Sequence, residues 1–155
     1  MPDQHIPVWM EKCFLEIGQQ EIIGAGDNPR ILEYQKYGTG NANDDIPWCA
    51  DFVNWGLGQF NIAGTKNSAA RSFLNWGDAC NAKFGCISIF RRGTKQENKA
   101  RVAAGLPEMG HVAFYLDQNN GWVSVLGGNQ SNRVGVGRYP LSDNLGFRWP
   151  QGLLL

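Results

Sequence analysis

The chain has 155 residues, of which 43% are hydrophobic and 18% are charged. This composition is typical of a folded globular protein and excludes an intrinsically disordered chain. Its 14 basic and 14 acidic side chains cancel, which argues against a protein held on nucleic acid by its overall field. A chain of this length is expected to form one domain over residues 1–155.

Four helices are expected in the first half of the chain, where apolar residues recur at helical spacing. They cover residues 7–17, a segment beginning at Asn28-Pro29, a segment beginning near Cys49, and residues 68–76. Asn28-Pro29 is a helix-start signal, because proline is tolerated at the first helical position. The third segment runs to Phe60 with its apolar residues on one side, so it is expected to be the central buried helix.

After Gly85 the hydrophobic period changes to two, which predicts strands at 86–90, 111–116, 122–126, 133–138 and 146–149. The turn Asp117–Gly121 contains an Asn-Gly pair, the strongest short-range signal for an antiparallel hairpin. Residues 93–110 predict a long polar loop. Helices followed by strands indicate an α+β fold, with N-terminal helices packed on a C-terminal antiparallel sheet.

The N-terminal residues 1–10 lack the basic leader and apolar core of a signal peptide. No stretch has the length and hydrophobicity of a membrane span. We therefore expect a protein made in the cytoplasm without a signal peptide. Any role outside the cytoplasm would then depend on delivery by a secretion machine, a phage particle or a lysis event.

Four cysteines, at positions 13, 49, 80 and 86, are too few and too unevenly spaced for a small disulfide scaffold. Cys80 and Cys86 flank a short stretch that could close as a local disulfide in an oxidising compartment, and the sequence leaves this pairing open. The paired Cys and His spacings of a zinc site are missing, and no metal or other cofactor is expected. Cys13 lies in an apolar helical segment and is expected to be buried.

Cys49 is the candidate nucleophile. It lies where a polar loop meets the start of an apolar helix, so its sulfur would face unpaired backbone N–H groups and the positive end of the helix dipole. That position favours the thiolate. Asp51, in the same first turn, opposes it, so a basic partner is needed. The alternative is that Cys49 is a structural cysteine of the core.

His111 is the candidate general base, because a cysteine hydrolase needs one and the only other histidine, His5, lies near the chain terminus. His111 opens an apolar strand directly after Gly110. It is expected at the end of the sheet, where a loop could leave its imidazole exposed. The alternative is a histidine that only satisfies its own hydrogen bonds at the sheet edge.

Asn129 is the candidate orienting residue. A turn centred near Asn119-Asn120 would place His111 opposite Gly128, within one residue, and so bring Asn129 beside the imidazole. An Asn oxygen can accept the imidazole N–H and fix the ring tautomer, which completes a Cys-His-Asn triad. The two glycines before Asn129 would leave room for this contact. The alternative is that they form only a turn.

Three segments carry a family resemblance: Pro47–Asn54, Gly110–Tyr115 and Leu126–Gln130. Together they resemble the motifs of CHAP-like, papain-fold cell-wall hydrolases of bacteria and phages, and the similarity extends over about residues 17–150. The resemblance implies a papain-like fold, a catalytic Cys at a helix N-terminus, a His on the facing sheet and hydrolysis of peptidoglycan amide bonds. Many CHAP domains carry a Glu near the Asn, where this chain has glycines.

The expected function is a peptidoglycan amidase or endopeptidase that uses Cys49, His111 and Asn129. It would act in the periplasm or cell wall of a target bacterium, as a phage lysis enzyme or as an antibacterial effector. An effector would require a secretion-system carrier and a cognate immunity protein. Two alternatives stay open: a same-fold acyltransferase or deamidase acting on a protein, and a non-catalytic cell-wall-binding module with a structural Cys49.

Overall fold

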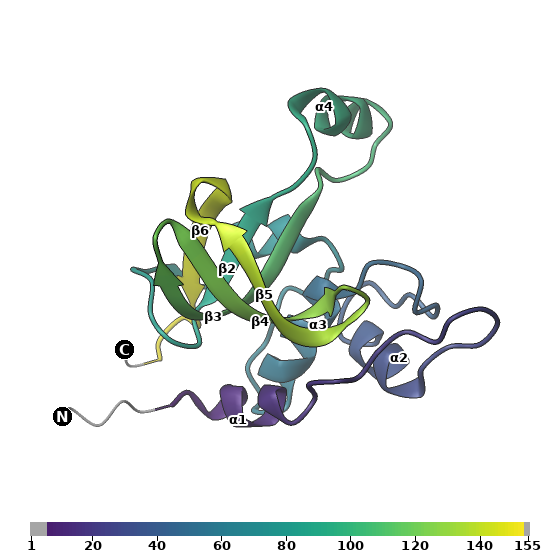
Figure 1. The fold of residues 1–155 in the computed structure, drawn as a ribbon, viewed down its shortest axis with the longest axis horizontal. Helices are drawn as coiled ribbons and strands as arrows, with labels where there is room; N and C mark the ends of the chain where they lie inside the picture. Colours follow the sequence, from purple (N-terminus) through teal and green to yellow (C-terminus); the bar gives the residue numbers. More distant parts are fainter. Residues whose placement is uncertain (1–5, 154–155) are drawn as a thin grey trace.

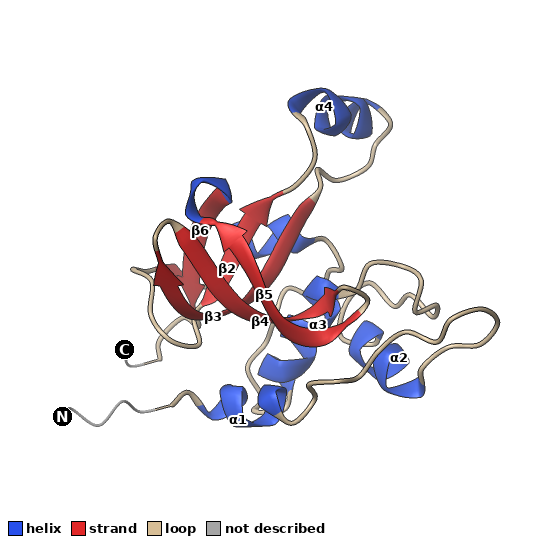
Figure 2. Cartoon of the chain, in the orientation of Figure 1, coloured by secondary structure: helices blue, strands red, loops and turns tan. Residues whose placement is uncertain are grey.

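Helices predominate in the first half of the chain and strands in the second, as the change of hydrophobic period predicts. The computed structural model describes residues 6–153, and Figures 1 and 2 show its helices and strands. The helices are α1 (Val8–Phe14), α2 (Pro29–Gln35), α3 (Cys49–Gly58) and α4 (Lys95–Ala103), with short 3-10 helices η1 (Ala70–Asn75) and η2 (Leu141–Asp143). The strands are β1 (Asp78–Ala79), β2 (Ile87–Arg91), β3 (Gly110–Asn119), β4 (Trp122–Gln130), β5 (Arg133–Pro140) and β6 (Asn144–Trp149). The α+β fold class is confirmed.

The sheet has the strand order β1-β6-β2-β3-β4-β5, and all of its neighbours are antiparallel. The predicted hairpin joins β3 to β4. Its turn residues are Asn120 and Gly121, with positive φ angles of 50° and 79°, which suits the tight turns that match the twist of a hairpin. The turn therefore lies one residue later than expected. β5 is an edge strand, a position that matters for the groove described below.

Helix α3 is the central helix, as predicted, and its residues from Cys49 to Leu57 are all buried. It packs against β3 and β4, as well as against α1 and α2. Two glycines permit this close approach. A Cβ atom at Gly56 would lie 2.6 Å from Cys13 Sγ, and one at Gly128 would lie 2.7 Å from the Phe52 Cβ. The N-terminus of α3 is therefore held directly against the sheet.

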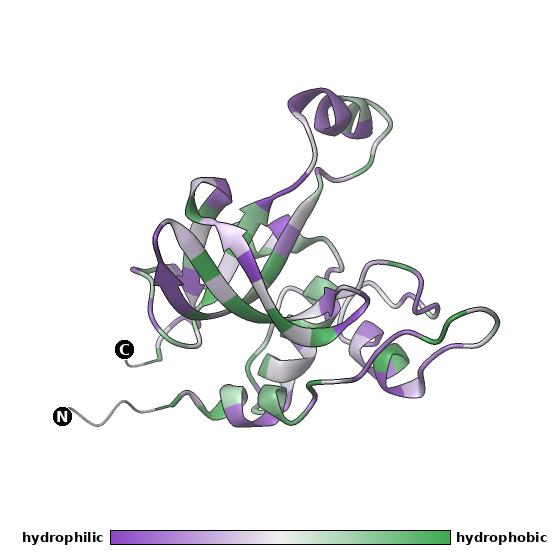
Figure 3. Cartoon of the chain, in the orientation of Figure 1, coloured by the Kyte–Doolittle hydropathy of each residue, from purple (hydrophilic) through white to green (hydrophobic). Residues whose placement is uncertain are grey.

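The polar segment 93–110, expected to be a loop, contains helix α4. Its start is a capping box: the Thr94 hydroxyl accepts a hydrogen bond from the Glu97 N–H (3.0 Å), and the Glu97 carboxylate accepts one from the Thr94 N–H (3.3 Å). Figure 3 shows α4 as mainly hydrophilic, and Figure 1 shows it projecting from the end of the sheet. A helix without an apolar stripe shows no helical period, which explains why the periodicity missed it.

Segment 68–76 was also predicted as a helix and forms the 3-10 helix η1. The start of α2 agrees with the prediction in detail. The Asn28 side chain accepts a hydrogen bond from the Arg30 N–H (2.9 Å), and Pro29 is the first helical residue. At α2 the local capping residues were therefore sufficient to predict the start of the helix.

The four cysteines are free, so Cys80 and Cys86 do not form the local disulfide that the sequence left open. Burial raises the pKa of the Cys86 thiol to about 12 and also raises the pKa of Cys80. Cys13 is fully buried, as expected. Burial therefore disfavours the thiolate form of both Cys80 and Cys86.

The helices in residues 6–153 are short, and the longest, α3, has 10 residues. None of them has the length and apolar character that crossing a membrane requires. Within the same residues, no group of three or more His, Cys, Asp or Glu side chains is placed to hold a metal ion.

Candidate active site

Cys49 is the first residue of α3, and only 5% of its surface is exposed. Its thiol lies against the backbone of Val112 on β3. The preceding residue, Trp48, is fully buried and donates a hydrogen bond from its indole Nε1 to Glu21 Oε1 (2.8 Å). The start of the helix is therefore held by two contacts, one with β3 and one with Glu21, and the sulfur lies beside the sheet.

The Cys49 thiol is protonated in the resting site, contrary to the expectation that a helix start favours thiolate. Burial is the main influence and raises its pKa. Hydrogen bonding to the Val112 backbone and the positive charge of Arg92 lower it, while the Asp51 charge raises it further. Desolvation of the anion therefore outweighs the helix dipole, and a base must remove the proton during attack.

His111 lies near the start of β3, immediately before Val112, at the strand end where a loop could have left it exposed, and it is fully buried. Tyr139 on β5 stacks on it, with ring centroids 4.6 Å apart and an angle of 20° between the planes. The pKa of the imidazole is lowered to about 3, mainly by burial and also by the positive charge of Arg92, while the hydrogen bond to Gln130 opposes the shift. His111 is therefore neutral at physiological pH and can accept a proton.

Gln130, and not the predicted Asn129, is the residue that contacts the imidazole. Its Oε1 lies 3.1 Å from His111 Nε2. Its amide Nε2 donates to the carbonyl groups of Gly135 and Val125, so the oxygen is the end of the amide that faces the ring. His111 Nε2 therefore carries the hydrogen and Nδ1 is the acceptor. Among the described residues, Nδ1 has no hydrogen-bond partner.

A bulge in β4 explains why Gln130 replaces Asn129. The pairing with β5 shifts register between Gly127 and Gln130, and Asn129 has a positive φ of 53°. A bulge interrupts the alternation of side chains along a strand, so the next residue faces His111. Glycine also makes room for Gln130, because a Cβ at Gly137 would lie 2.5 Å from its Oε1.

A groove of about 810 Å³ opens at Cys49. One wall consists of residues 105–110, which connect α4 to β3, together with Arg92 and Arg101. The rest of the lining consists of residues 39 and 41, residues 46–47 just before α3, and residues 67–70 up to the start of η1. The segment that carries α4 therefore shapes the space in which a substrate would meet the thiol.

Asp51 fastens α3 to the rim of this groove. The carboxylate is fully buried, and its Oδ1 accepts a hydrogen bond from the hydroxyl of Ser68, a groove residue (2.6 Å). Its Oδ2 has no partner in the part of the chain that the structure describes. Burial raises the pKa of this carboxyl to about 6, and the Ser68 hydrogen bond opposes the shift.

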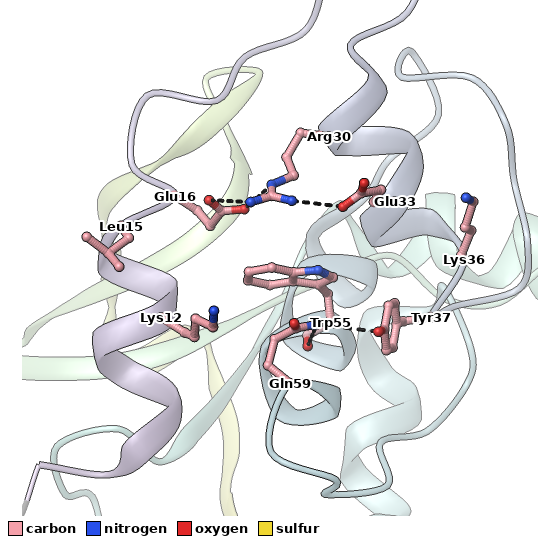
Figure 4. A pocket seen from close by; sticks show the side chains of 9 residues that line it. All are labelled: Lys12, Leu15, Glu16, Arg30, Glu33, Lys36, Tyr37, Trp55 and Gln59. Atoms are coloured by element: carbon pink, nitrogen blue, oxygen red, sulfur yellow. Dashed lines mark hydrogen bonds and ion pairs between the residues drawn. The ribbon is translucent and has the colours of Figure 1, made fainter.

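A second hollow, of about 410 Å³, lies among α1, α2 and α3. Figure 4 shows Arg30 between Glu16 and Glu33, above the face of Trp55. The Arg30 guanidinium lies 2.5 Å from Glu16, 2.9 Å from Glu33 and 5.5 Å from the ring centroid of Trp55. The Arg30 charge is paired with two carboxylates and stacked on an aromatic ring. The cluster is therefore a structural link between helices and not a candidate site.

Each of the three sequence motifs contributes one side chain to the site: Cys49, His111 and Gln130. The other histidine, His5, lies outside the described residues. No protein-family model and no curated protein matches this sequence. What can be inferred about function therefore comes from the contacts of these side chains and from the short motifs that carry them.

Proposed function

We propose that this chain is a papain-like cysteine hydrolase that cleaves amide bonds of bacterial peptidoglycan, with Cys49 as nucleophile and His111 as general base. The observation that carries the proposal is the state of the imidazole. Gln130 contacts Nε2 of the His111 ring, and within residues 6–153 the Nδ1 atom has no partner and can accept a proton. Val112, the residue after His111, contacts the Cys49 thiol through its backbone. The likeness of the motifs to CHAP-like hydrolases supports cell-wall peptide as the substrate.

The chemistry begins from a neutral thiol and a neutral imidazole. His111 Nδ1 takes the thiol proton as the sulfur attacks the amide carbonyl, so the charged pair exists only while substrate fills the groove. The imidazolium then protonates the leaving amine, the C–N bond breaks and an acyl-enzyme remains. His111 next removes a proton from water, which attacks the thioester, releases the carboxylic acid and restores the thiol.

The backbone of α3 supplies the natural oxyanion donor. The first N–H groups of a helix have no intrahelical acceptor, and the N–H of Cys49 belongs to the same residue as the nucleophile. A carbonyl oxygen bound there would gain negative charge at the positive end of the helix dipole. The helix start thus favours the tetrahedral intermediate, although it does not ionise the resting thiol.

The direct test is incubation of purified sacculi with the wild-type protein and mass spectrometry of the soluble products. We expect soluble muropeptides and one new amino terminus for each bond cut, with Cys49→Ala as the inactive control. Release of ammonia from protein Gln without muropeptides would instead indicate a deamidase. Binding to sacculi without any cleavage would indicate a wall-binding module. Either result would refute the proposed reaction.

The Gln130→Ala variant is expected to lower kcat/KM about 100-fold, because a displacement of about 1 Å in a catalytic group costs roughly that much. The Asn129→Gly variant is the matched control. It removes the neighbouring side chain at a positive φ, where glycine is unstrained, and should keep near wild-type activity. Rates of muropeptide release compare the two. The assignment fails if Asn129→Gly is the more damaging change.

The Gln130→Glu variant separates orientation of the imidazole from general loss of structure. A carboxylate next to His111 would raise the pKa of the imidazole, because it stabilises the charged form. The acidic limb of the kcat/KM profile should therefore move to higher pH, whereas a variant that is only destabilised would lose activity at every pH. Thermal unfolding of each variant provides the independent measure of stability.

A further inference from the structure

A second groove lies beside the active site, along β5. It has a volume of about 560 Å³ and is lined by Arg92, by residues 130–131 and 133–139, and by residues 17–18. We call it the arginine groove, because it contains Arg92, Arg133 and Arg138 and its lining includes no Asp or Glu. In a chain whose formal net charge is zero, this is a local concentration of positive charge.

The three arginines are available for a ligand. All are exposed, and none of them takes part in an ion pair among residues 6–153. The Arg138 guanidinium lies over the ring of Trp122, 5.4 Å from its centroid, which holds it without neutralising it. Unpaired guanidinium groups bind carboxylates through two parallel hydrogen bonds.

Arg92 connects the arginine groove to the nucleophile. It lines both this groove and the groove that opens at Cys49. Two other residues of the arginine groove, Gln130 and Tyr139, contact His111 directly. A ligand that continues from the thiol past Arg92 therefore enters the arginine groove without leaving the active site.

The shape of the groove fits an extended chain. Arg133 and Arg138 are five residues apart on β5, about 17 Å at about 3.3 Å per residue of strand, and by strand alternation they lie on opposite faces of the sheet, so one small anion cannot bridge them. β5 is also an edge strand. Residues 18 and 19 form backbone hydrogen bonds with Val134 on the outer side of β5. By strand alternation, the N–H and C=O groups of Val136 face this same outer side, beyond the residues that pair with Val134. A peptide could pair with this edge.

We propose that the arginine groove binds the free carboxylates of an extended peptide whose scissile amide lies at Cys49. This inference rests on the proposed hydrolase function and specifies its substrate as an acidic peptide. Arg92 would bind a carboxylate close to the reacting bond, and Arg133 and Arg138 would bind carboxylates farther along the chain. Amidated peptides of the same sequence would lack these contacts.

The test uses the full chain carrying Cys49→Ala, which cannot cut its substrate, and sacculi freed of phosphate polymers. One portion keeps its carboxylates, and the other is amidated with carbodiimide and methylamine. We expect sedimentation to show about 10-fold tighter binding to the untreated sacculi. Adding Arg133→Gln and Arg138→Gln should remove most of this preference and leave the part that Arg92 contributes.

Lys95→Gln combined with Lys99→Gln is the charge-matched control, because both lysines are exposed on α4 and lie outside the arginine groove. It should retain the full preference. If circular dichroism shows that the double variant is unfolded, then each single variant should still reduce the preference. Equal binding to both kinds of sacculi, or an undiminished preference in the arginine variants, would overturn the inference. A wild-type protein that prefers untreated sacculi but cuts neither would refute the hydrolase function and retain carboxylate binding.

Discussion

Replacing Cys49 with serine is expected to reduce muropeptide release by at least about 1000-fold, the scale of loss when a catalytic nucleophile is removed. Serine has nearly the same shape, so the fold should be preserved. Its hydroxyl is a much weaker acid than a thiol, and the pKa of His111 is only about 3. A hydroxyl is also the weaker nucleophile, so proton removal during attack is much less favourable from oxygen than from sulfur.

The control for this experiment is Cys80→Ser, which changes a half-buried cysteine outside the proposed site. Initial rates on dye-labelled sacculi and thermal unfolding should be measured for both variants. We expect Cys80→Ser to keep its activity and both variants to unfold within a few degrees of the wild type. If Cys49→Ser retained more than about a tenth of the wild-type rate, then Cys49 would be a structural cysteine.

The second large effect concerns stability in acid. The pKa of His111 is lowered to about 3 in the folded chain, below its ordinary value of 6.5, so the folded state excludes a proton that the unfolded state binds. This contribution to stability is complete above pH 6.5 and is lost as the pH falls towards 3. The loss is about 1.4 kcal/mol per pH unit, or about 3 kcal/mol at pH 4.

The His111→Gln variant cannot bind this proton. Between pH 7.5 and pH 4 it should therefore lose about 3 kcal/mol less free energy of unfolding than the wild type does. Denaturant unfolding at the two pH values measures this difference directly. Equal losses in the two proteins would show that the imidazole is solvated in the native state and titrates normally.

Asp51 acts in the opposite direction and provides the control. Its pKa is raised from 3.8 to about 6, so the buried carboxylate lowers stability above pH 6, and this cost is relieved as the pH falls towards 3.8. Asp51→Asn removes the relief and should therefore lose more stability than the wild type on acidification. The two variants are thus expected to deviate from the wild type with opposite signs.

Local patterns in the sequence were sufficient for most of the elements. The Asn28-Pro29 start of α2, the start of α3 at Cys49 and the Asn-Gly turn of the β3–β4 hairpin all depend on neighbouring residues, and each is found where the pattern indicates, within one residue. Helix α4 is the exception. Its capping box was present in the sequence, but a polar helix that buries little leaves no periodic signal.

The candidate site could be predicted only in part, because part of it depends on an irregularity in the sheet. Cys49 and His111 were identified from motifs, and the hairpin correctly indicated the region of β4 that faces His111. The choice between Asn129 and Gln130 depended on a bulge, which reverses the side-chain alternation that register arithmetic assumes. The approach of Arg92, which follows β2, to Arg133 and Arg138 on β5 likewise depends on segments that are distant in sequence.

The sequence by itself determined which residue types lie at a helix start and at a strand start, because these depend on local capping, periodicity and turn chemistry. Only the tertiary structure decided their chemical state. Burial makes Cys49 a protonated thiol and His111 a neutral imidazole, against the thiolate that the helix start favours. The free energy of desolvation depends on everything that surrounds a group, and most of those neighbours come from elsewhere in the chain.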